Sequence, residues 1–276
     1  MDSLVNKVAE LMRETSDELI MPRYKTLNDS QINQKTGPKD LVTIADIESE
    51  RRLTPALKSL LPGSKVVGEE AVSENAEVLC ELDGDGAVWL VDPVDGTNNF
   101  ARGERYFCVM VGLVQKNEII LGVILDPIGG YWVGAEKNAG AYRVEFNGVK
   151  SERLNVLSPL PLDQMFGSLN FGFTDPQDRE IVRSRALKFF KGHHRHGCSG
   201  HEYLDLVLGK SYFSTHIKNM PWDHVAGCAI HTEAGGYHAR FNGEVYNPKV
   251  QNGGLLAAPT KESWTEISNR LLAGIQ

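Results

Sequence analysis

The chain contains few cysteines, and their spacing argues against the sites that cysteines usually build. The four are Cys80, Cys108, Cys198 and Cys228. They are far apart and form no CxxC pair, so we expect neither a cysteine zinc motif nor a dithiol redox motif. Free thiols of this kind are typical of a reducing compartment, and we therefore predict a cytoplasmic protein.

Long apolar runs and an excess of positive charge are also missing. No apolar run approaches the roughly 18 residues of a membrane-spanning helix, and the first residues, MDSLVNKVAEL, lack the basic and apolar regions of a secretory signal. The formal net charge of −7 argues against a surface that coats nucleic acid. We therefore expect no membrane partner and no nucleic-acid partner.

The 276 residues are enough for one large domain or two closely packed ones. Residues 107–146 show four strand patterns joined by turn residues, which predicts a mostly antiparallel sheet with helices packed on it. After about residue 150, short helix and strand patterns alternate, as expected for a smaller α/β half. We therefore predict an N-terminal α+β half over 1–150 and a C-terminal α/β half over 151–276.

Local patterns predict several elements of the N-terminal half. An amphipathic helix is expected over 3–20, and a second helix from residue 44 to about 60, with a kink or break at Pro55. The segments 35–40 and 73–86 are rich in polar and turn residues, so we expect them to form loops.

One stretch, AVWLVDPVDGTNNF at residues 87–100, combines an apolar strand with polar residues at its end. Asp92 and Asp95 are three residues apart and can converge on one hard cation or a pair of cations. Gly96 permits close approach of the backbone, and the amides of Gly96 and Thr97 would face a phosphate if a helix begins there. The alternative is a simple turn, since Asp-Pro and Asp-Gly are common turn formers.

Two further acidic motifs lie at predicted element boundaries. Glu69 and Glu70 follow a predicted strand, and Asp223 lies at the start of a predicted helix. Considered separately, the glutamates fit a solvated pair and the aspartate fits a helix cap. Together with Asp92 and Asp95 they indicate a common cleft, because each acid lies where a strand or helix end would expose it. Oxygen ligands without histidine or cysteine favour Mg²⁺ or Mn²⁺ over zinc.

Four motifs follow one another along the chain. They are DLVTIAD at 40–46, GEE at 68–70, DPVDGTNNF at 92–100, and WDHVAG with the trailing TEAGG at 222–236. In these motifs the chain resembles the inositol monophosphatase family, within the lithium-sensitive, magnesium-dependent phosphatase superfamily. The resemblance covers most of the chain. It implies a layered αβαβα sandwich, lithium sensitivity and, because the family is often dimeric, a homodimer.

The resemblance implies a metal-binding role for the acids of these motifs. Two or three Mg²⁺ ions would be bound by the side chains of Glu69, Asp92, Asp95 and Asp223 and by the backbone carbonyl of Val94. Such a site needs its cations, because carboxylates alone would repel the phosphate dianion that is to be hydrolysed.

The resemblance also implies how water and phosphate are handled. Thr97 and Asp46 would form a relay that, with Glu69 and a metal, activates the attacking water. The amides of Gly96 and Thr97 would bind the phosphate, and Lys35 would lie in an N-terminal loop near the most weakly held metal. The implied activity is therefore hydrolysis of a phosphomonoester by metal-activated water.

The substrate is less constrained than the reaction. Asp223 and Ser199 are implied substrate contacts, Ser199 as part of a stretch of small residues. Inositol-specific members carry a glutamate seven residues before the aspartate of the WD motif, whereas this chain has His216 there, which lacks the charge and paired oxygens of a carboxylate. We expect a small sugar or polyol phosphate similar to inositol 1-phosphate, with histidinol phosphate and fructose 1,6-bisphosphate as alternatives. Asn98-Asn99 makes a 3′,5′-bisphosphonucleotide a weaker candidate.

Two weaker interpretations involve the histidine-rich stretch GHHRHG at 192–197. It motivates, with His216, a non-catalytic phosphate sensor, although the presence of Thr97, Asp46 and Glu69 favours an enzyme. Its composition also resembles that of a metal site. We interpret it instead as a polar loop or edge strand flanking the substrate mouth, where Arg195 is a candidate contact for a second acidic group of the ligand.

Overall fold

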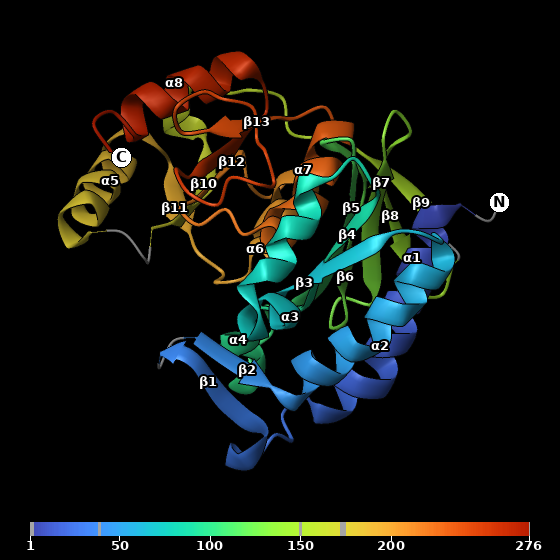
Figure 1. Ribbon diagram of the computed structural model, residues 1–276. Coiled ribbons are helices and arrows are strands. Elements are labelled where there is room, and N and C mark those ends of the chain that lie inside the picture. Colours follow the sequence, from blue (N-terminus) through green and yellow to red (C-terminus); the bar gives the residue numbers. More distant parts are fainter. Residues whose placement is uncertain (1–2, 38–39, 149–150, 172–174, 276) are drawn as a thin grey trace.

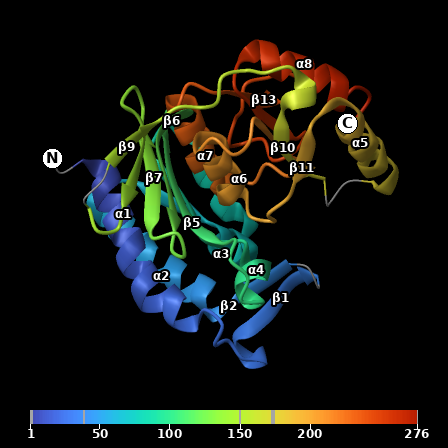
Figure 2. The same ribbon diagram turned by 180° about the vertical axis from the view of Figure 1, so that it is seen from behind.

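Helices and sheets alternate in five layers in the computed structural model of this chain (Figure 1). Helices α1 and α2 cover one face of a seven-stranded sheet, α6 and α7 lie between this sheet and a five-stranded one, and α5 and α8 form the far layer (Figure 2). The predicted αβαβα sandwich is therefore confirmed. The structure describes residues 3–37, 40–148, 151–171 and 175–275.

Eight α-helices occur among the described residues, and none has the length and apolar content to cross a membrane. Their bounds are α1 Leu4–Thr15, α2 Ile44–Leu60, α3 Glu69–Glu74, α4 Thr97–Ala101, α5 Pro176–Phe189, α6 Ser199–Val207, α7 Pro221–Glu233 and α8 Lys261–Leu271. The helix predicted over 3–20 is α1 followed by a π-helical turn, Ser16–Ile20.

The large sheet runs in chain order from β3 to β9, and only its first pair, β3 and β4, is parallel. Its strands are β3 Lys65–Gly68, β4 Val88–Asp95, β5 Cys108–Gln115, β6 Glu118–Asp126, β7 Tyr131–Glu136, β8 Gly140–Glu145 and β9 Ser151–Leu154. The predicted meander is confirmed. Since β9 pairs with β8, this sheet extends past residue 150; the division into halves at that point stays a prediction.

The small sheet has the order β11-β10-β12-β14-β13 and mixes parallel with antiparallel pairs. Its strands are β10 Phe166–Asn170, β11 Gly192–His194, β12 Phe213–His216, β13 Tyr237–Arg240 and β14 Leu255–Ala258. Its mixed pairing and its helices agree with the smaller α/β half that alternation predicted. The edge position of β11 agrees with the interpretation of the histidine-rich stretch as an edge strand.

Strand β4, second from one edge of the large sheet, is buried along its whole length because both faces of the sheet are covered there. Val88 and Leu90 pack toward α6 and α7, whereas Trp89 and Val91 pack toward α1 and α2. Burial on both faces explains the continuous apolar run before Asp92, because a strand with one solvated face would alternate in polarity. The sheet therefore holds the end of β4 rigidly.

Residues 35–37 and 40, expected as part of a polar loop, instead belong to the two strands of a hairpin, so the prediction is wrong for these residues. Strand β1 (Ile32–Gly37) pairs antiparallel with β2 (Asp40–Thr43), and residues 38–39 lie outside the described part. The two strands form a separate small sheet held by backbone hydrogen bonds. Because β1 is mostly polar, it has no alternation of apolar residues from which a strand could be recognised.

Two other expectations need correction. Residues 73–86 are not a plain loop, because they contain the end of α3 and a 3₁₀ helix, Ala76–Asp83, whose first turn is capped by Asn75. No break occurs at Pro55, which lies within the continuous helix α2, and the alternative of a kink there stays a prediction. An interior proline costs about 3 kcal/mol, and the complete burial of Leu53 and Leu57 offsets that cost.

Candidate functional site

A cavity of about 650 Å³ lies at the carboxyl end of β4, with α3, α4 and α7 around it. Strands β3 and β4 are parallel, so the residues that follow them meet at one edge of the sheet. Glu69 follows β3, Asp92 and Asp95 end β4, and Asp223 is the third residue of α7. All four line the cavity, and we call them the acidic cluster. The sequence motifs thus come together as predicted.

The end of β4 departs from regular pairing where the two aspartates lie. The register with β5 shifts between Asp92 and Asp95, around Pro93, which has no N–H to donate to the ladder. The amide of Val94 donates to Oδ1 of Asp92 at 3.0 Å. Gly96 then turns the chain into α4 with φ of +88°, and a Cβ there would stand 2.6 Å from the carbonyl oxygen of Tyr106. Only glycine fits this turn.

Asp95 is held from the C-terminal half of the chain. Its Oδ2 accepts a hydrogen bond from the amide of Gly200 at 2.6 Å and one from the thiol of Cys198 at 3.0 Å. Both donors lie at the start of α6, so that helix fixes the orientation of the carboxylate. Cys198 therefore positions the carboxylate of Asp95. The spacing of the cysteines gave no sign of this role.

Electrostatics make the acidic cluster unfavourable without cations. Burial raises the pKa of Asp92 well above its ordinary value, and the charges of Glu69 and Asp95 raise it further. Burial likewise raises the pKa of Asp223, and the neighbouring carboxylates add to this effect, while a hydrogen bond with Asp92 acts in the opposite direction. Buried acids in this arrangement bind protons or cations more readily than isolated acids do.

Lys35 reaches into the same cavity from the hairpin. Its Nζ lies 2.7 Å from Oε1 of Glu69 and 2.8 Å from Oε1 of Glu70. Burial alone would lower the pKa of Lys35, but the two carboxylates outweigh it and raise this pKa. Burial and the charge of Glu69 raise the pKa of Glu70 to about 8 despite the lysine. The lysine predicted to lie near a metal thus contacts one of the predicted ligands.

Glu50, in α2, supports the acidic cluster although the motifs did not point to it. Its carboxylate accepts hydrogen bonds at 2.8 Å from the amides of Glu70 and Ala71, which caps the start of α3. Gly68 makes room for this carboxylate, since a Cβ at that position would lie 2.2 Å from Cδ of Glu50. In the sequence, only the glycine of the GEE motif indicated that another group packs closely here. Glu50 itself looks like a solvated helix residue.

The predicted partners Thr97 and Asp46 are in contact. Oγ1 of Thr97 lies 3.1 Å from Oδ1 of Asp46 and 3.0 Å from the carbonyl oxygen of Val94. Oδ2 of Asp46 accepts hydrogen bonds from the amide and the hydroxyl of Thr43. Asp46 is completely buried, and burial raises its pKa to about 6 even though Thr43 lowers it. Thr97 lines the cavity, whereas Asp46 does not and lies behind it.

Two predicted substrate contacts do not line the cavity. Ser199 is buried at the start of α6, and His216 is buried at the end of β12, stacked on Tyr203 with ring centroids 5.3 Å apart. Their contact with a substrate stays a prediction. Lys218 and Trp222 do line the cavity, next to the WD motif. They were missed because no spacing rule distinguishes a lining residue from its neighbours.

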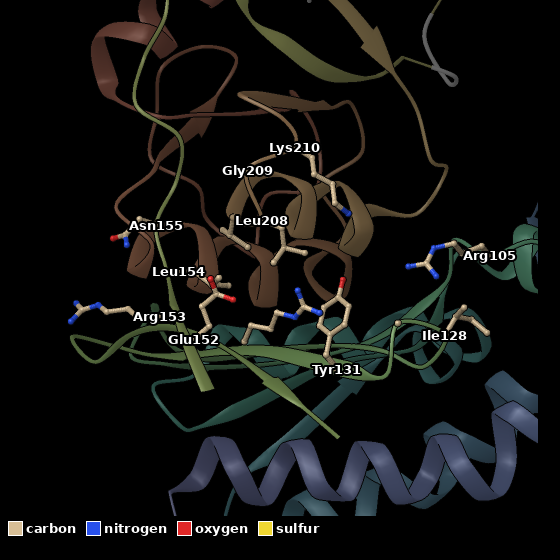
Figure 3. A pocket seen from close by; sticks show the side chains of 13 residues that line it. Arg105, Ile128, Tyr131, Glu152, Arg153, Leu154, Asn155, Leu208, Gly209 and Lys210 are labelled. Carbon is tan, nitrogen blue, oxygen red and sulfur yellow. The ribbon is translucent and has the colours of Figure 1, made fainter. Parts of the chain in front are cut away.

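A second cavity, of about 750 Å³, lies between the outer strands of the large sheet and the end of α6 (Figure 3). It brings together four cations, Arg105, Arg143, Arg153 and Lys210. Glu152 is the one acidic residue among the described residues that line it. Because it offers no group of converging carboxylates, it does not match the chemistry that the motifs predict.

Comparisons with known proteins cover nearly the whole chain. The model of the inositol monophosphatase family matches residues 2–275. The chain is 26% identical over 248 residues to an inositol-1-monophosphatase from Bacillus subtilis strain 168, covering 89% of this chain and 88% of that protein. It is 30% identical over 224 residues to a fructose-1,6-bisphosphatase/inositol-1-monophosphatase from Thermotoga maritima, covering 80% and 79%.

The fold agrees with these matches. The structure is similar to a solved IMPase from Thermotoga maritima, with a TM-score of 0.82 and 26% identity over 100% of both chains. The likeness therefore includes both sheets and the helices between them. The chain belongs to the inositol monophosphatase family.

Proposed function

We propose that this protein is a Mg²⁺-dependent phosphomonoesterase that acts on a small sugar or polyol phosphate. The observation that carries the proposal is the convergence of the acidic cluster on one cavity, beside the turn at Gly96. Membership of a family of phosphomonoesterases supports it. The relatives named above supply two substrate classes, inositol monophosphate and fructose 1,6-bisphosphate.

The residues of the cavity fit Mg²⁺, with Mn²⁺ as a substitute. The acidic cluster and the carbonyl of Val94 would hold the ions, since hard divalent cations prefer oxygen ligands. Bound Mg²⁺ lowers the pKa of water and neutralises the charge of a transferring phosphoryl group. Lys35 adds a fixed positive charge beside Glu69, which leaves fewer uncompensated carboxylates in the cluster.

Thr97 is in a position to orient water. Its hydroxyl carries one proton, which it donates toward Asp46 or the carbonyl of Val94. The oxygen lone pairs then remain available to accept a hydrogen bond from a water molecule in the cavity. The amides of Gly96 and Thr97, at the turn into α4, would bind a phosphate oxygen. Lys218, at the cavity wall, supplies a positive charge to the anionic substrate.

Replacing Thr97 by valine should lower kcat about 100-fold, because the isosteric side chain cannot accept a hydrogen bond from water or donate to Asp46. Thr97→Ser is the matched control, since it retains the hydroxyl and should retain most of the activity. Steady-state kinetics of both variants measure the difference. Equal losses in the two variants would contradict the role of the hydroxyl.

A substrate panel tests the proposed function itself. Inositol 1-phosphate, fructose 1,6-bisphosphate, histidinol phosphate and a 3′,5′-bisphosphonucleotide should be compared by kcat/KM, with Mg²⁺ and with chelator. We expect Mg²⁺-dependent release of phosphate, fastest with a sugar or polyol phosphate. No turnover of any member, or turnover indifferent to chelator, would overturn the proposal. Calorimetric binding without turnover would favour a phosphate sensor. Lithium inhibition, a homodimer and a cytoplasmic location stay predictions.

A further inference from the structure

A second group of potential metal ligands lies outside the acidic cluster, where β11 leads into α6. It consists of His194 at the end of β11, His196 in the loop and Asp205 in α6. Nε2 of His196 lies 2.7 Å from Oδ2 of Asp205, and Nε2 of His194 lies 3.3 Å from the same oxygen. Three potential ligand atoms, from a strand, the loop after it and the next helix, thus face one point.

His194 shows that this group is not a complete hydrogen-bond network. Its Nε2 faces Asp205 without forming an aligned hydrogen bond, and both of its ring nitrogens are shielded from solvent with no hydrogen-bond partner among the described residues. Unpartnered buried polar atoms are rare and require an explanation. A cation between the imidazoles and the carboxylate would satisfy the inward-facing nitrogen.

The three side chains are held in place by their surroundings. The ring of His194 stacks on Phe166 with centroids 5.2 Å apart, and that of His196 stacks on Tyr106 at 3.9 Å. The exposed amine of Lys210 lies 3.2 Å from Oδ1 of Asp205, which leaves Oδ2 for the histidines. Ligands that are already oriented lose little conformational freedom when an ion binds.

We infer that His194, His196 and Asp205 form a second metal site that takes a transition ion such as Zn²⁺. Two imidazole nitrogens and one carboxylate oxygen are a typical zinc set, and solvent can complete a tetrahedral arrangement because the two histidine side chains are partly exposed. Imidazole suits Zn²⁺, Co²⁺, Ni²⁺ and Cu²⁺, whereas Mg²⁺ prefers oxygen. The two sites of this protein would therefore select different ions.

The position of this site gives it a structural role near the cavity. The carbonyl of His196 accepts a hydrogen bond from the side chain of Asn99 in α4, at 3.0 Å. Gly197 lines the cavity, and the thiol of Cys198 donates to Asp95. An ion that joins His194 and His196 to α6 would therefore fix the segment that orients Asp95.

The test is the binding of Zn²⁺ to chelator-treated protein in excess Mg²⁺, which occupies oxygen sites. We expect one equivalent of Zn²⁺ by calorimetry, a raised melting temperature, and visible absorption when Co²⁺ is the probe. Asp205→Asn and His196→Gln should each weaken binding about 100-fold, since even partners of ligands contribute 10- to 100-fold. His193→Ala is the matched control, because this neighbouring histidine lies outside the group.

Binding that is absent in the unaltered protein, or that survives both ligand substitutions, would overturn the inference. So would equal weakening in the His193→Ala variant. Circular dichroism shows whether each variant is folded, and if one ligand variant is not, the other decides. These measurements do not depend on phosphatase activity, so failure of the proposed function leaves them interpretable.

Discussion

Replacing Asp95 by asparagine should lower kcat/KM at least about 1,000-fold without lowering the melting temperature of the chelator-treated protein. A metal acting as a Lewis acid supplies several kcal/mol of transition-state stabilisation, and each 1.36 kcal/mol is a tenfold rate change. Asparagine offers only one neutral oxygen to an ion. If the side-chain carbonyl replaces Oδ2, it still accepts from Gly200, at 2.6 Å in the unaltered protein.

The melting temperature should be retained because the substitution also relieves repulsion. Burial is the main cause of the raised pKa values of Asp92 and Asp223, and the charge of Asp95 raises both further. Removing that charge makes the remaining buried carboxylates less unfavourable in the absence of metal. Loss of activity with retained stability therefore separates a functional acid from a structural one.

Asp126 provides the opposite case and serves as the control. It is completely buried at the end of β6, accepts a hydrogen bond from the amide of Gly129 at 2.7 Å and pairs with Arg105 at 3.2 Å. Asp126→Asn weakens charge-assisted bonds worth about 1–3 kcal/mol, so it should lower the melting temperature and leave kcat/KM nearly unchanged. Kinetics and thermal unfolding of both variants measure the contrast. Full activity in Asp95→Asn would remove this residue from the catalytic site.

The sequence predicted the acids of this site but not the residues that support them. The acids could be found because each lies at the end of a strand, just after one, or at the start of a helix, and such positions face a cleft. Glu50 could not, because its role depends on the space above Gly68 rather than on any local pattern. The burial of His216 away from the cavity could not be predicted either. The packing of the small sheet against α6 decides whether the end of β12 lines the cavity.

The elements of the fold show a similar division. Strand β9 of the large sheet, which is mostly polar and exposed, was missed. Strands β3 to β8 were predictable, and in β4 burial on both faces leaves a long apolar run. The hairpin that carries Lys35 was not, since polar strands give no periodic signal. The family resemblance implied that Lys35 lies near a metal, and its contacts with Glu69 and Glu70 agree with that position.

Chelator-treated protein should become less stable as the pH rises from about 7.5 to 8.5, and Mg²⁺ should reverse this trend. Burial is the main cause that raises the pKa of Glu70 to about 8 and the pKa values of Asp92 and Asp223, whereas unfolded carboxyls titrate near 4. Between these values the folded state binds more protons, so the free energy of unfolding falls as the pH rises. Histidines with lowered pKa values, such as His224, act in the opposite direction near pH 6.5, where their unfolded forms are still partly protonated. Above about pH 7.5 they add little, because they are then mostly neutral in both states.

Mg²⁺ binds the ionised acids in competition with protons, so its stabilisation should grow over the same range. An ion at 100 times its dissociation constant adds about 2.7 kcal/mol, which corresponds to a rise in melting temperature of about 5 °C or more. Thermal unfolding at several pH values, with Mg²⁺ and with chelator, measures both slopes. An equal Mg²⁺ effect at pH 6.5 and 8.5 would contradict the coupling of ions to these acids.

Two substitutions distinguish the acids that cause the pH dependence of stability from those that bind Mg²⁺. Burial also raises the pKa of Glu202 to about 8, but this residue lies in α6 and does not line the cavity. Glu202→Gln should therefore flatten part of the pH dependence and leave the effect of Mg²⁺ intact. Asp223→Asn should reduce both, because this acid is a proposed ligand as well as a proton site. If the two variants responded alike to Mg²⁺, the stabilising ion would have to bind somewhere other than the cavity at the end of β4.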